Sequence, residues 1–293
     1  MTYPEWLDRN AYPFEPHYFQ TAAGRMHYVD VGSGEPIVFL HGNPAWSFLY
    51  RKQISRFSAG YRCIAPDLIG FGFSDKPRDW EYLPEQHAAN IAALIDHLGL
   101  DRITLVVNDW GGPIGMSYAV NHPEKVQRLV VLNTWAWPVD DDFHYTSFSA
   151  LMGGPLGRFL IRRFNFFVNS FMRVAFGDKR RLEKAAHAHY RHALPTPDAR
   201  KGCCVFPGQI IGSTKWLAAL WSRIGLLKET STLFVWGMKD IAFREKELQR
   251  WQAALPNSHT VRLPGVGHFV AEEAPEALAE AMEAFLANTK RTP

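Results

Sequence analysis

The sequence predicts an α/β protein with a mostly parallel sheet, because short apolar segments alternate with segments of helical spacing. Residues 36–40 and 103–107 are continuous apolar runs, typical of strands that are buried on both faces. Residues 85–98 repeat apolar side chains every three or four positions and end before Gly99, as an amphipathic helix does. Strands joined through helices in this way form parallel sheets with right-handed crossovers.

The remaining elements follow the same alternation along the chain. Residues 26–31 alternate apolar and polar side chains, which favours a strand at the edge of the sheet. Further strands are expected at residues 62–67, 126–132, 232–236 and 260–263, and further helices after residue 110 and at residues 244–255 and 275–286.

The alternation stops near Trp135, and from there to about residue 226 the chain has helical spacing and is rich in Phe and Arg. We therefore divide the sequence into an α/β core in two parts, residues 1–134 and 227–293, and an inserted helical cap, residues 135–226. Ligands bind at the carboxyl edge of open parallel sheets, so the cap is expected to cover that edge.

Composition and charge exclude several classes of function. The 293 residues are 47% hydrophobic and carry a net charge of +3, too small to favour nucleic acid as a partner. No apolar run approaches the roughly 20 residues that span a membrane, and the N-terminal segment lacks the apolar region of a signal peptide. The three cysteines match no metal or disulfide spacing. We expect a cytoplasmic protein.

A histidine cluster in the cap raises the question of a metal site. His187, His189 and His192 lie close together in the sequence, but no cysteine or carboxylate completes a ligand set. We therefore expect no metal ion and no other cofactor.

A strand–turn–helix segment around Asp109 is the first candidate for chemistry. The apolar run 103–107 leads into NDWGG, the arrangement of a nucleophile elbow with aspartate where serine is usual. Taken alone, Asp109 is equally well explained as a helix N-cap. Asp240 and His268, however, follow two later strands, and the chain order nucleophile, acid, histidine is that of α/β-hydrolases. We therefore expect Asp109 to be a nucleophile.

Seven motifs resemble those of haloalkane dehalogenases of the α/β-hydrolase superfamily, over essentially the whole chain. They are HGNPAWSFLYR (41–51), DLIGFGFSDKP (67–77), NDWGGPIG (108–115), NTWAWP (133–138), FNFFV (164–168), WGMKDIAF (236–243) and GVGHF (265–269). The pairing of HGNP with DWGG is specific, because epoxide hydrolases usually carry an aromatic residue at the position of Asn43. The resemblance implies an eight-stranded, mostly parallel sheet with an inserted helical cap.

The resemblance also assigns the acid of the triad. In this family the acid follows either of two strands, and here the earlier position is Asn133, which cannot carry the charge, so Asp240 supplies it. The combination resembles the third dehalogenase subfamily. That subfamily also includes the β-lactone decarboxylases of bacterial olefin biosynthesis.

These residue types suit substitution at saturated carbon. Asp109 is ionised at neutral pH and can displace a halide directly, which gives an alkyl ester. The indole N–H of Trp110 and the amide of Asn43 are donors for the departing halide ion. His268, supported by Asp240, would then activate a water molecule that hydrolyses the ester. The expected substrate is a small apolar halogenated compound, and no nucleic acid or transmembrane segment is expected.

Three other functions remain open at this stage. β-Lactone decarboxylation to an alkene would use the same residues. A non-catalytic scaffold has no need of five intact functional groups. An epoxide hydrolase would need two tyrosine acids in the cap, for which Tyr145 and Tyr190 are present, but Asn43 argues against it.

Aromatic and basic residues of the cap suggest two further features. Phe143, Phe167, Phe206 and Phe269 are candidate walls of a substrate pocket, although each is also explained by packing within the cap. Residues 151–184 carry eight Lys and Arg against two acids, interleaved with Phe. This pattern indicates either a solvated basic face or a surface for self-association, so a homo-oligomer formed through the cap is possible.

Overall fold

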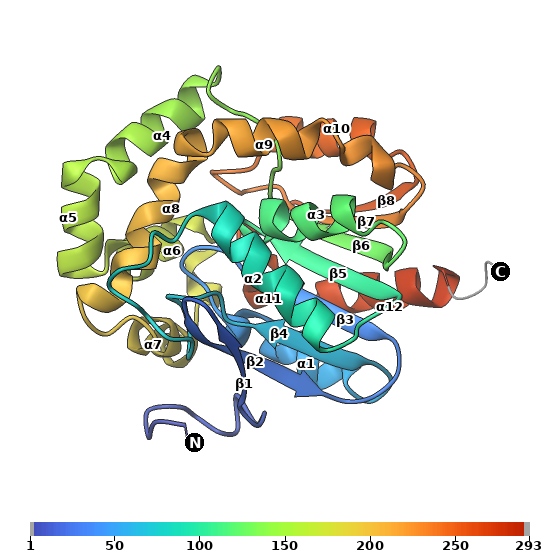
Figure 1. Ribbon diagram of the computed structural model, residues 1–293, viewed down its shortest axis with the longest axis horizontal. Coiled ribbons are helices and arrows are strands. Elements are labelled where there is room, and N and C mark those ends of the chain that lie inside the picture. The colour runs from blue at the N-terminus through green and yellow to red at the C-terminus, as the bar shows by residue number, and fades with distance from the viewer. Residues whose placement is uncertain (1–2, 290–293) are drawn as a thin grey trace.

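The computed structural model describes residues 3–289 and contains one sheet of eight strands (Figure 1). The strands are β1 (His17–Thr21), β2 (Gly24–Val31), β3 (Pro36–Leu40), β4 (Arg62–Pro66), β5 (Ile103–Asn108), β6 (Val126–Leu132), β7 (Ser231–Gly237) and β8 (Ser258–Leu263). Their order is β1-β2-β4-β3-β5-β6-β7-β8. The pairs β1–β2 and β2–β4 are antiparallel and the other five are parallel, which confirms the predicted mostly parallel sheet.

One strand was not expected from the sequence. β2 was predicted to lie at the edge, but β1 pairs outside it, with Tyr18 opposite His27. The pattern of β1 is weak, because four of its five residues are only partly buried or exposed and do not alternate cleanly. At the centre of the sheet the apolar runs behave as predicted, since every residue of β3 and β5 is buried.

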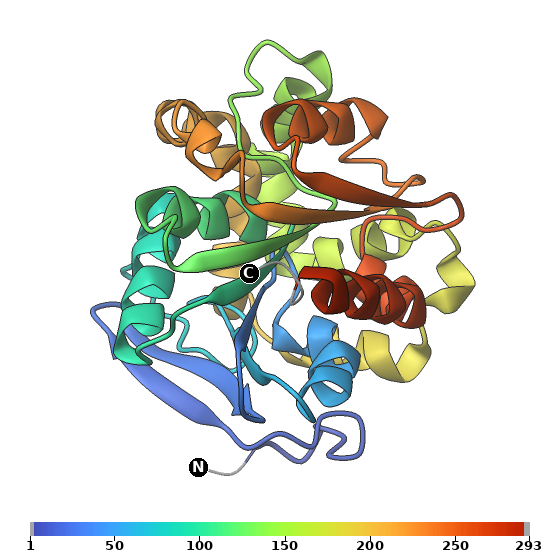
Figure 2. The same cartoon turned by 90° about the vertical axis from the view of Figure 1, so that its right-hand side faces the viewer.

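Helices cover both faces of the sheet. α2 (Pro84–His97) and α3 (Gly111–Asn121) lie on one face, and α1 (Arg51–Phe57) and α12 (Pro275–Thr289) lie on the other (Figure 2). The core is completed by α10 (Glu245–Ala254), the single turn α11 (Val270–Glu273) and the 3-10 turn η1 (Ser47–Tyr50). No helix in residues 3–289 is both long and apolar enough to cross a membrane.

Between β6 and β7 the chain contains helices and loops, which we call the helical insertion. Its α-helices are α4 (Phe143–Gly153), α5 (Pro155–Phe164), α6 (Met172–Ala175), α7 (Lys184–His192), α8 (Lys201–Gly212) and α9 (Thr214–Trp221). Shorter turns are the π-helix η2 (Phe167–Phe171) and the 3-10 helices η3 (Lys179–Arg181), η4 (Asp198–Arg200) and η5 (Ile224–Leu227). In Figure 1 the helices α4 to α8 lie together at one end of the sheet.

A buried ion pair of the core is also bonded by a tyrosine of the insertion. The guanidinium of Arg51 in α1 makes two hydrogen bonds to the carboxylate of Glu272 in α11, at 2.6 and 2.7 Å. The hydroxyl of Tyr190 in α7 donates to the same carboxylate at 2.6 Å. Charges removed from water need such partners, so these contacts specify how α7 sits on the core.

Candidate active site

Asp109 occupies a sharp turn between β5 and α3. Its φ angle of +51° lies in the left-handed region that non-glycine residues rarely adopt, as expected of a nucleophile elbow. The turn is tightly packed: a Cβ atom at Gly112 would lie 1.9 Å from Oγ1 of Thr134. Local strain of this kind is held by the surrounding structure and projects the Asp109 carboxylate beyond the sheet.

Two backbone N–H groups converge on the carboxylate of Asp109. The N–H of Asn43 donates to Oδ1 at 2.7 Å, and the N–H of Trp110 also donates to this side chain. Gly42 permits the approach, because a Cβ there would lie 2.2 Å from Oδ1. Burial raises the pKa of Asp109, and the nearby His268 and the two N–H groups oppose this shift. The pair of donors forms a potential oxyanion hole.

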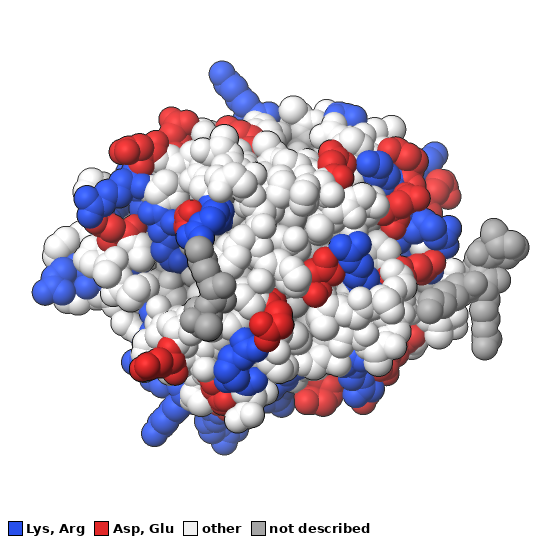
Figure 3. Space-filling view, turned by 60° about the horizontal axis from the view of Figure 1, so that its bottom comes forward, with Lys and Arg blue, Asp and Glu red and all other residues white. Residues whose placement is uncertain are grey.

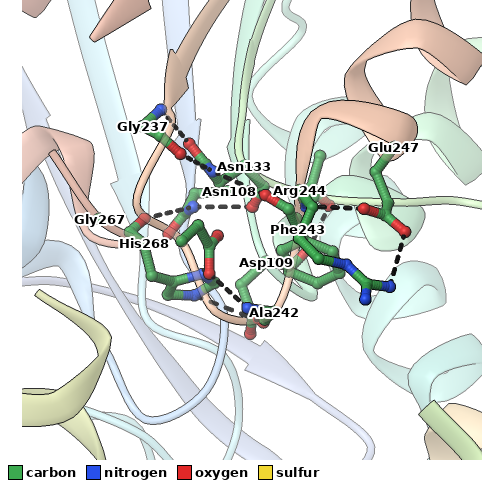
Figure 4. A network of polar contacts seen from close by, with 12 residues as sticks. Asn108, Asp109, Asn133, Gly237, Ala242, Phe243, Arg244, Glu247, Gly267 and His268 are labelled. Atoms are coloured by element: carbon green, nitrogen blue, oxygen red, sulfur yellow. Dashed lines mark hydrogen bonds and ion pairs between the residues drawn. The ribbon is translucent and has the colours of Figure 1, made fainter. Parts of the chain in front are cut away.

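His268 lies between two carboxylates. Its Nδ1 is 2.9 Å from Oδ2 of Asp240, and its Nε2 is 3.7 Å from Oδ2 of Asp109 (Figure 4). Asp240 is fixed in turn by the N–H of Ala242, which donates to its Oδ1 at 2.7 Å. Burial alone disfavours the imidazolium, but Asp240 and then Asp109 outweigh it and raise the pKa of His268 above its usual value.

Asn133 directly follows β6. Its amide bonds both to the carbonyl (3.0 Å) and to the N–H (2.7 Å) of Gly237, at the end of β7. Its backbone carbonyl accepts from the side chain of Asn108, which also donates to the carbonyl of His268 at 3.4 Å. Figure 4 shows this chain of amides behind the triad. Asn133 therefore ties together the strand ends that carry the triad.

Trp110 and Asn43 border the same space. The Trp110 ring stacks on Phe206 at 4.9 Å and meets Trp135 edge-on at 4.6 Å, so its plane is fixed. Its indole N–H has no hydrogen-bond partner among the described residues. The Asn43 side chain donates one N–H to the carbonyl of Cys203 at 3.3 Å, and a second N–H remains.

The carbonyl that anchors Asn43 is available for a local reason. It belongs to Cys203 in α8, where Pro207 stands four residues later and has no N–H to close the helical hydrogen bond. The amide of Asn43 takes that place. A proline inside a helix of the insertion thus orients a donor of the core.

The site faces an apolar cavity of about 220 Å³. It is lined by Asn43, Asp109, Trp110, Trp135, His144, Tyr145, Phe148, Phe167, Phe171, Pro207, Ile210, Ile241, Ala242, Phe243, His268 and Phe269. Four of the five predicted functional residues, all except Asp240, are in this set. Asp240 lies behind His268 with no exposed side-chain surface, as suits a residue that acts through the imidazole.

Of the four predicted aromatic walls, two line the cavity. Phe167 and Phe269 do so, while Phe206 lies one layer further out, against the ring of Trp110. The prediction for Phe143 is wrong: its side chain is 84% exposed. Phe143 is the first residue of α4, and this helix buries the face that carries Tyr145, which is about 200° away around the helix axis.

Sequence reasoning missed several wall residues. Phe148 and Phe171 line the cavity from α4 and η2, and Phe243 lines it from the loop after β7. The spacing of Phe148 from Tyr145 by three positions, on one face of a helix, was the available signal. The π-helical turn at Phe167–Phe171, by contrast, has no recognisable pattern in the sequence.

Two histidines of the helical insertion have structural partners. His187 and His189 bond to the carbonyls of Val168 and Ala185, at 2.7 and 2.8 Å. Among residues 3–289, no three His, Cys, Asp or Glu side chains form a cluster that could hold a metal ion.

The two candidate tyrosine acids are also engaged. The hydroxyl of Tyr145 donates to the carbonyl of Ala242 at 3.0 Å, although its ring lines the cavity. The hydroxyl of Tyr190 donates to Glu272, and Tyr190 is not among the residues that line the cavity. The pair of cap acids that epoxide opening requires is therefore not formed.

Comparisons with known proteins agree with this architecture. The profile of the alpha/beta hydrolase fold family matches residues 35–275, which assigns the class. Haloalkane dehalogenase 2 of Mycobacterium tuberculosis is 42% identical over 277 residues, covering 94% of this chain and 96% of the relative. The crystal structure of the haloalkane dehalogenase DatA from Agrobacterium tumefaciens superimposes with a TM-score of 0.83 at 28% identity, over 94% of this chain and 97% of that one. The chain belongs to the haloalkane dehalogenase family of α/β-hydrolases.

A second kind of relative is more distant. The cis-3-alkyl-4-alkyloxetan-2-one decarboxylase of Shewanella oneidensis is 31% identical and covers 95% of this chain and 90% of the relative. An alkyloxetan-2-one is a β-lactone, so this relative is named for the decarboxylation of β-lactones.

Proposed function

We propose that this protein hydrolyses small haloalkanes to an alcohol and a halide ion, with Asp109 as the nucleophile. The observation that carries the proposal is the position of the Asp109 carboxylate: it faces an apolar cavity, with His268 3.7 Å away and the donors Asn43 and Trp110 beside it. An ionised carboxylate in such a place can attack carbon directly, whereas a serine hydroxyl would first need a base to remove its proton.

The first step is displacement of the halide. One oxygen of Asp109 forms a bond to the carbon as the carbon–halogen bond breaks, and the halide leaves with the electron pair. The indole N–H of Trp110 and the free N–H of Asn43 donate to the departing ion. Because the cavity is apolar and both donors are held in place, they stabilise the developing charge more strongly than bulk solvent would.

The second step hydrolyses the ester of Asp109. A water molecule gives a proton to Nε2 of His268 and attacks the ester carbonyl, while the two backbone N–H groups at Asn43 and Trp110 stabilise the oxyanion. The oxyanion then collapses and the bond to the alkoxide oxygen breaks, so that the alcohol leaves with the proton from Nε2, and the carboxyl group of Asp109 releases its proton to solvent. Esterification also makes His268 a readier base. It removes the negative charge of Asp109, which is one of the two carboxylates that raise the pKa of His268. The pKa of His268 then falls, which favours the neutral imidazole that the step requires.

The size of the cavity favours a short substrate. A water molecule occupies about 30 Å³ in the liquid, so 220 Å³ is space for about seven of them. A methylene group has a similar size, and a haloalkane of a few carbons fits. A β-lactone with two long alkyl chains would extend beyond a cavity of this volume.

Offering two substrates separately tests the proposal. The purified enzyme should release bromide from 1,2-dibromoethane, and the Asp109→Ala variant should release none, which excludes spontaneous hydrolysis. A dialkyl β-lactone should give little alkene. Rapid alkene formation with only trace bromide would make β-lactone decarboxylation the reaction of this site and contradict the proposal.

We also propose that the protein self-associates through α4 and α5. Leu151, Leu156, Phe159 and Phe164 are each more than half exposed on these helices. Clustered exposed apolar side chains are typical of interaction surfaces. Lys and Arg side chains project at the left edge of Figure 3, on the side where α5 lies in Figure 1.

Light scattering tests the self-association. Assembly that persists at high salt and is lost in a Leu156→Glu, Phe159→Glu variant supports an apolar contact through α5. A monomer at every protein concentration contradicts it.

A further inference from the structure

Glu273, at the end of α11, is a buried carboxylate that accepts three backbone hydrogen bonds. Its Oε2 accepts from the N–H of Gly267 at 2.8 Å and of Gly177 at 3.0 Å, and its Oε1 accepts from the N–H of Asp178 at 2.7 Å. Gly267 directly precedes His268, whereas Gly177 and Asp178 belong to the helical insertion. One side chain therefore bridges the loop of the catalytic histidine and the insertion.

The two backbones that Glu273 bridges are in close contact. The N–H of His268 donates to the carbonyl of Ala175, at the end of α6, at 2.8 Å. A Cβ at Gly267 would lie 2.1 Å from that same carbonyl oxygen, and a Cβ at Gly177 would lie 2.4 Å from the carbonyl oxygen of Gly265. Only glycine at both positions lets the segments approach this closely.

The environment of Glu273 differs from that of its neighbour Glu272. Both side chains are buried, at 4% and 5% exposure. Glu272 is paired with the guanidinium of Arg51 and the hydroxyl of Tyr190. Among residues 3–289, by contrast, no Lys, Arg or His side chain forms an ion pair with Glu273. Burial of a carboxylate raises the free energy of the folded state unless the group is hydrogen-bonded. The three N–H groups of the two segments therefore compensate for the burial of Glu273.

We propose that Glu273 is a positioning residue for ester hydrolysis, because it fixes the His268 loop against the insertion. Asp240 orients the imidazole at Nδ1, and Glu273 fixes the backbone from which the ring extends. Together they hold Nε2 beside the carboxylate of Asp109, where it can take a proton from the attacking water. This inference rests on the proposed function, in which only the second step needs a base. Displacement of halide by Asp109 does not depend on it.

The variant Glu273→Gln tests the role, with Glu272→Gln as the matched control. Glutamine presents an NH₂ group in place of one oxygen, so a backbone N–H then faces a donor and the loop shifts. A displacement of about 1 Å in a catalytic group can cost on the order of 100-fold in rate. We expect steady-state release of bromide from 1,2-dibromoethane to fall about 10- to 100-fold in Glu273→Gln, with the first turnover unchanged.

The amount of alkyl ester on Asp109 separates a positioning role from a merely structural one, because destabilisation of the fold alone would not make the ester accumulate. Intact-mass spectrometry during turnover should show the alkyl ester accumulating in Glu273→Gln and not in Glu272→Gln, although thermal melting should show that both are destabilised. Equal ester levels in the two variants, or a slower first turnover in Glu273→Gln, would overturn the proposal.

A second measurement needs neither a variant nor turnover. In the unaltered protein, hydrogen exchange followed by NMR should find the amides of Gly177, Asp178, Gly267 and His268 protected, in contrast to the exposed Gly265. Exchange of all five at similar rates would contradict the bridge. Bromide release by the unaltered enzyme tests the proposed function separately, so the two ideas can fail independently.

Discussion

The two sides of the cavity are built in different ways. The floor, at the carboxyl edge of the sheet, consists of polar groups fixed by hydrogen bonds: both donors to Asp109 are backbone N–H groups, and His268 is bonded at its ring and its backbone. The roof, contributed by the insertion, is mostly aromatic. Phe148, Phe167 and Phe171 contact one another there, with ring centroids 5.2 to 6.3 Å apart.

The difference separates chemistry from substrate choice. Hydrogen bonds to fixed backbone groups hold the floor within the narrow tolerance that bond making and breaking require. Apolar contacts are non-directional, so the roof can change in shape while the floor keeps its geometry. Changes to the floor should therefore alter the rate for every substrate, and changes to the roof should alter the preference between substrates.

A large effect is expected from a donor of the floor. Trp110→Phe keeps an aromatic ring against Phe206 and removes the indole N–H. Loss of one preorganised donor costs about 10²–10³ in rate, so bromide release should fall by that factor for short and long substrates alike. Steady-state kinetics measures it.

Trp135→Phe is the control for that experiment. The ring of Trp135 also lines the cavity, but its indole nitrogen is buried, so this N–H does not reach the space where the halide would lie. Little change is expected. If Trp110→Phe behaves like Trp135→Phe, the assignment of Trp110 as a halide donor is wrong.

A change in the roof should have a smaller and selective effect. Phe167→Ala enlarges the cavity, so that a longer substrate fits. One additional substrate methylene group in an apolar pocket changes kcat/KM by about 10-fold or more. The ratio of kcat/KM for 1-bromohexane to that for 1,2-dibromoethane should rise by roughly that factor. Phe143→Ala, at an exposed position, should leave the ratio unchanged. A uniform loss for both substrates in Phe167→Ala would mean that the roof also supports the chemistry.

The smallest effect concerns the pH dependence. In the free enzyme, Asp240 and Asp109 raise the pKa of His268 above its usual value despite burial. Esterification removes the charge of Asp109, so the pKa of His268 is lower in the intermediate, and hydrolysis persists to lower pH than titration of the free enzyme suggests. The acid limb of kcat should therefore lie below the pKa of His268 measured by NMR in the free enzyme. An acid limb at or above that pKa would contradict the coupling.

The floor could be predicted from the sequence more completely than the roof. Asn43, Asp109 and Asp240 each follow a strand with a clear apolar pattern, and His268 follows β8, whose pattern is weaker because none of its residues is buried. Parallel strands bring their carboxyl ends to one edge. The amide network of Asn108 and Asn133 was not predicted, because its contacts join segments far apart in the chain.

The roof depends on how short helices turn relative to the core. Phe143 and Phe148 belong to the same helix, yet one is exposed and the other lines the cavity. Composition did not distinguish them, since α4 has apolar residues around much of its circumference. Its orientation comes from packing against α8, which includes the hydrogen bond from Ser149 to the carbonyl of Pro207. Such contacts between distant segments leave little trace in local sequence.

Asp109 displaces the halide and His268 is needed only to hydrolyse the ester that results. Trapping this ester tests the assignment of the two roles most directly. His268→Gln retains a polar side chain of similar size but removes the base. Exposed to 1,2-dibromoethane, this variant should release one bromide per chain and then stop, and mass spectrometry should find an alkyl adduct that maps to Asp109. Continued release of bromide without any adduct would contradict the account.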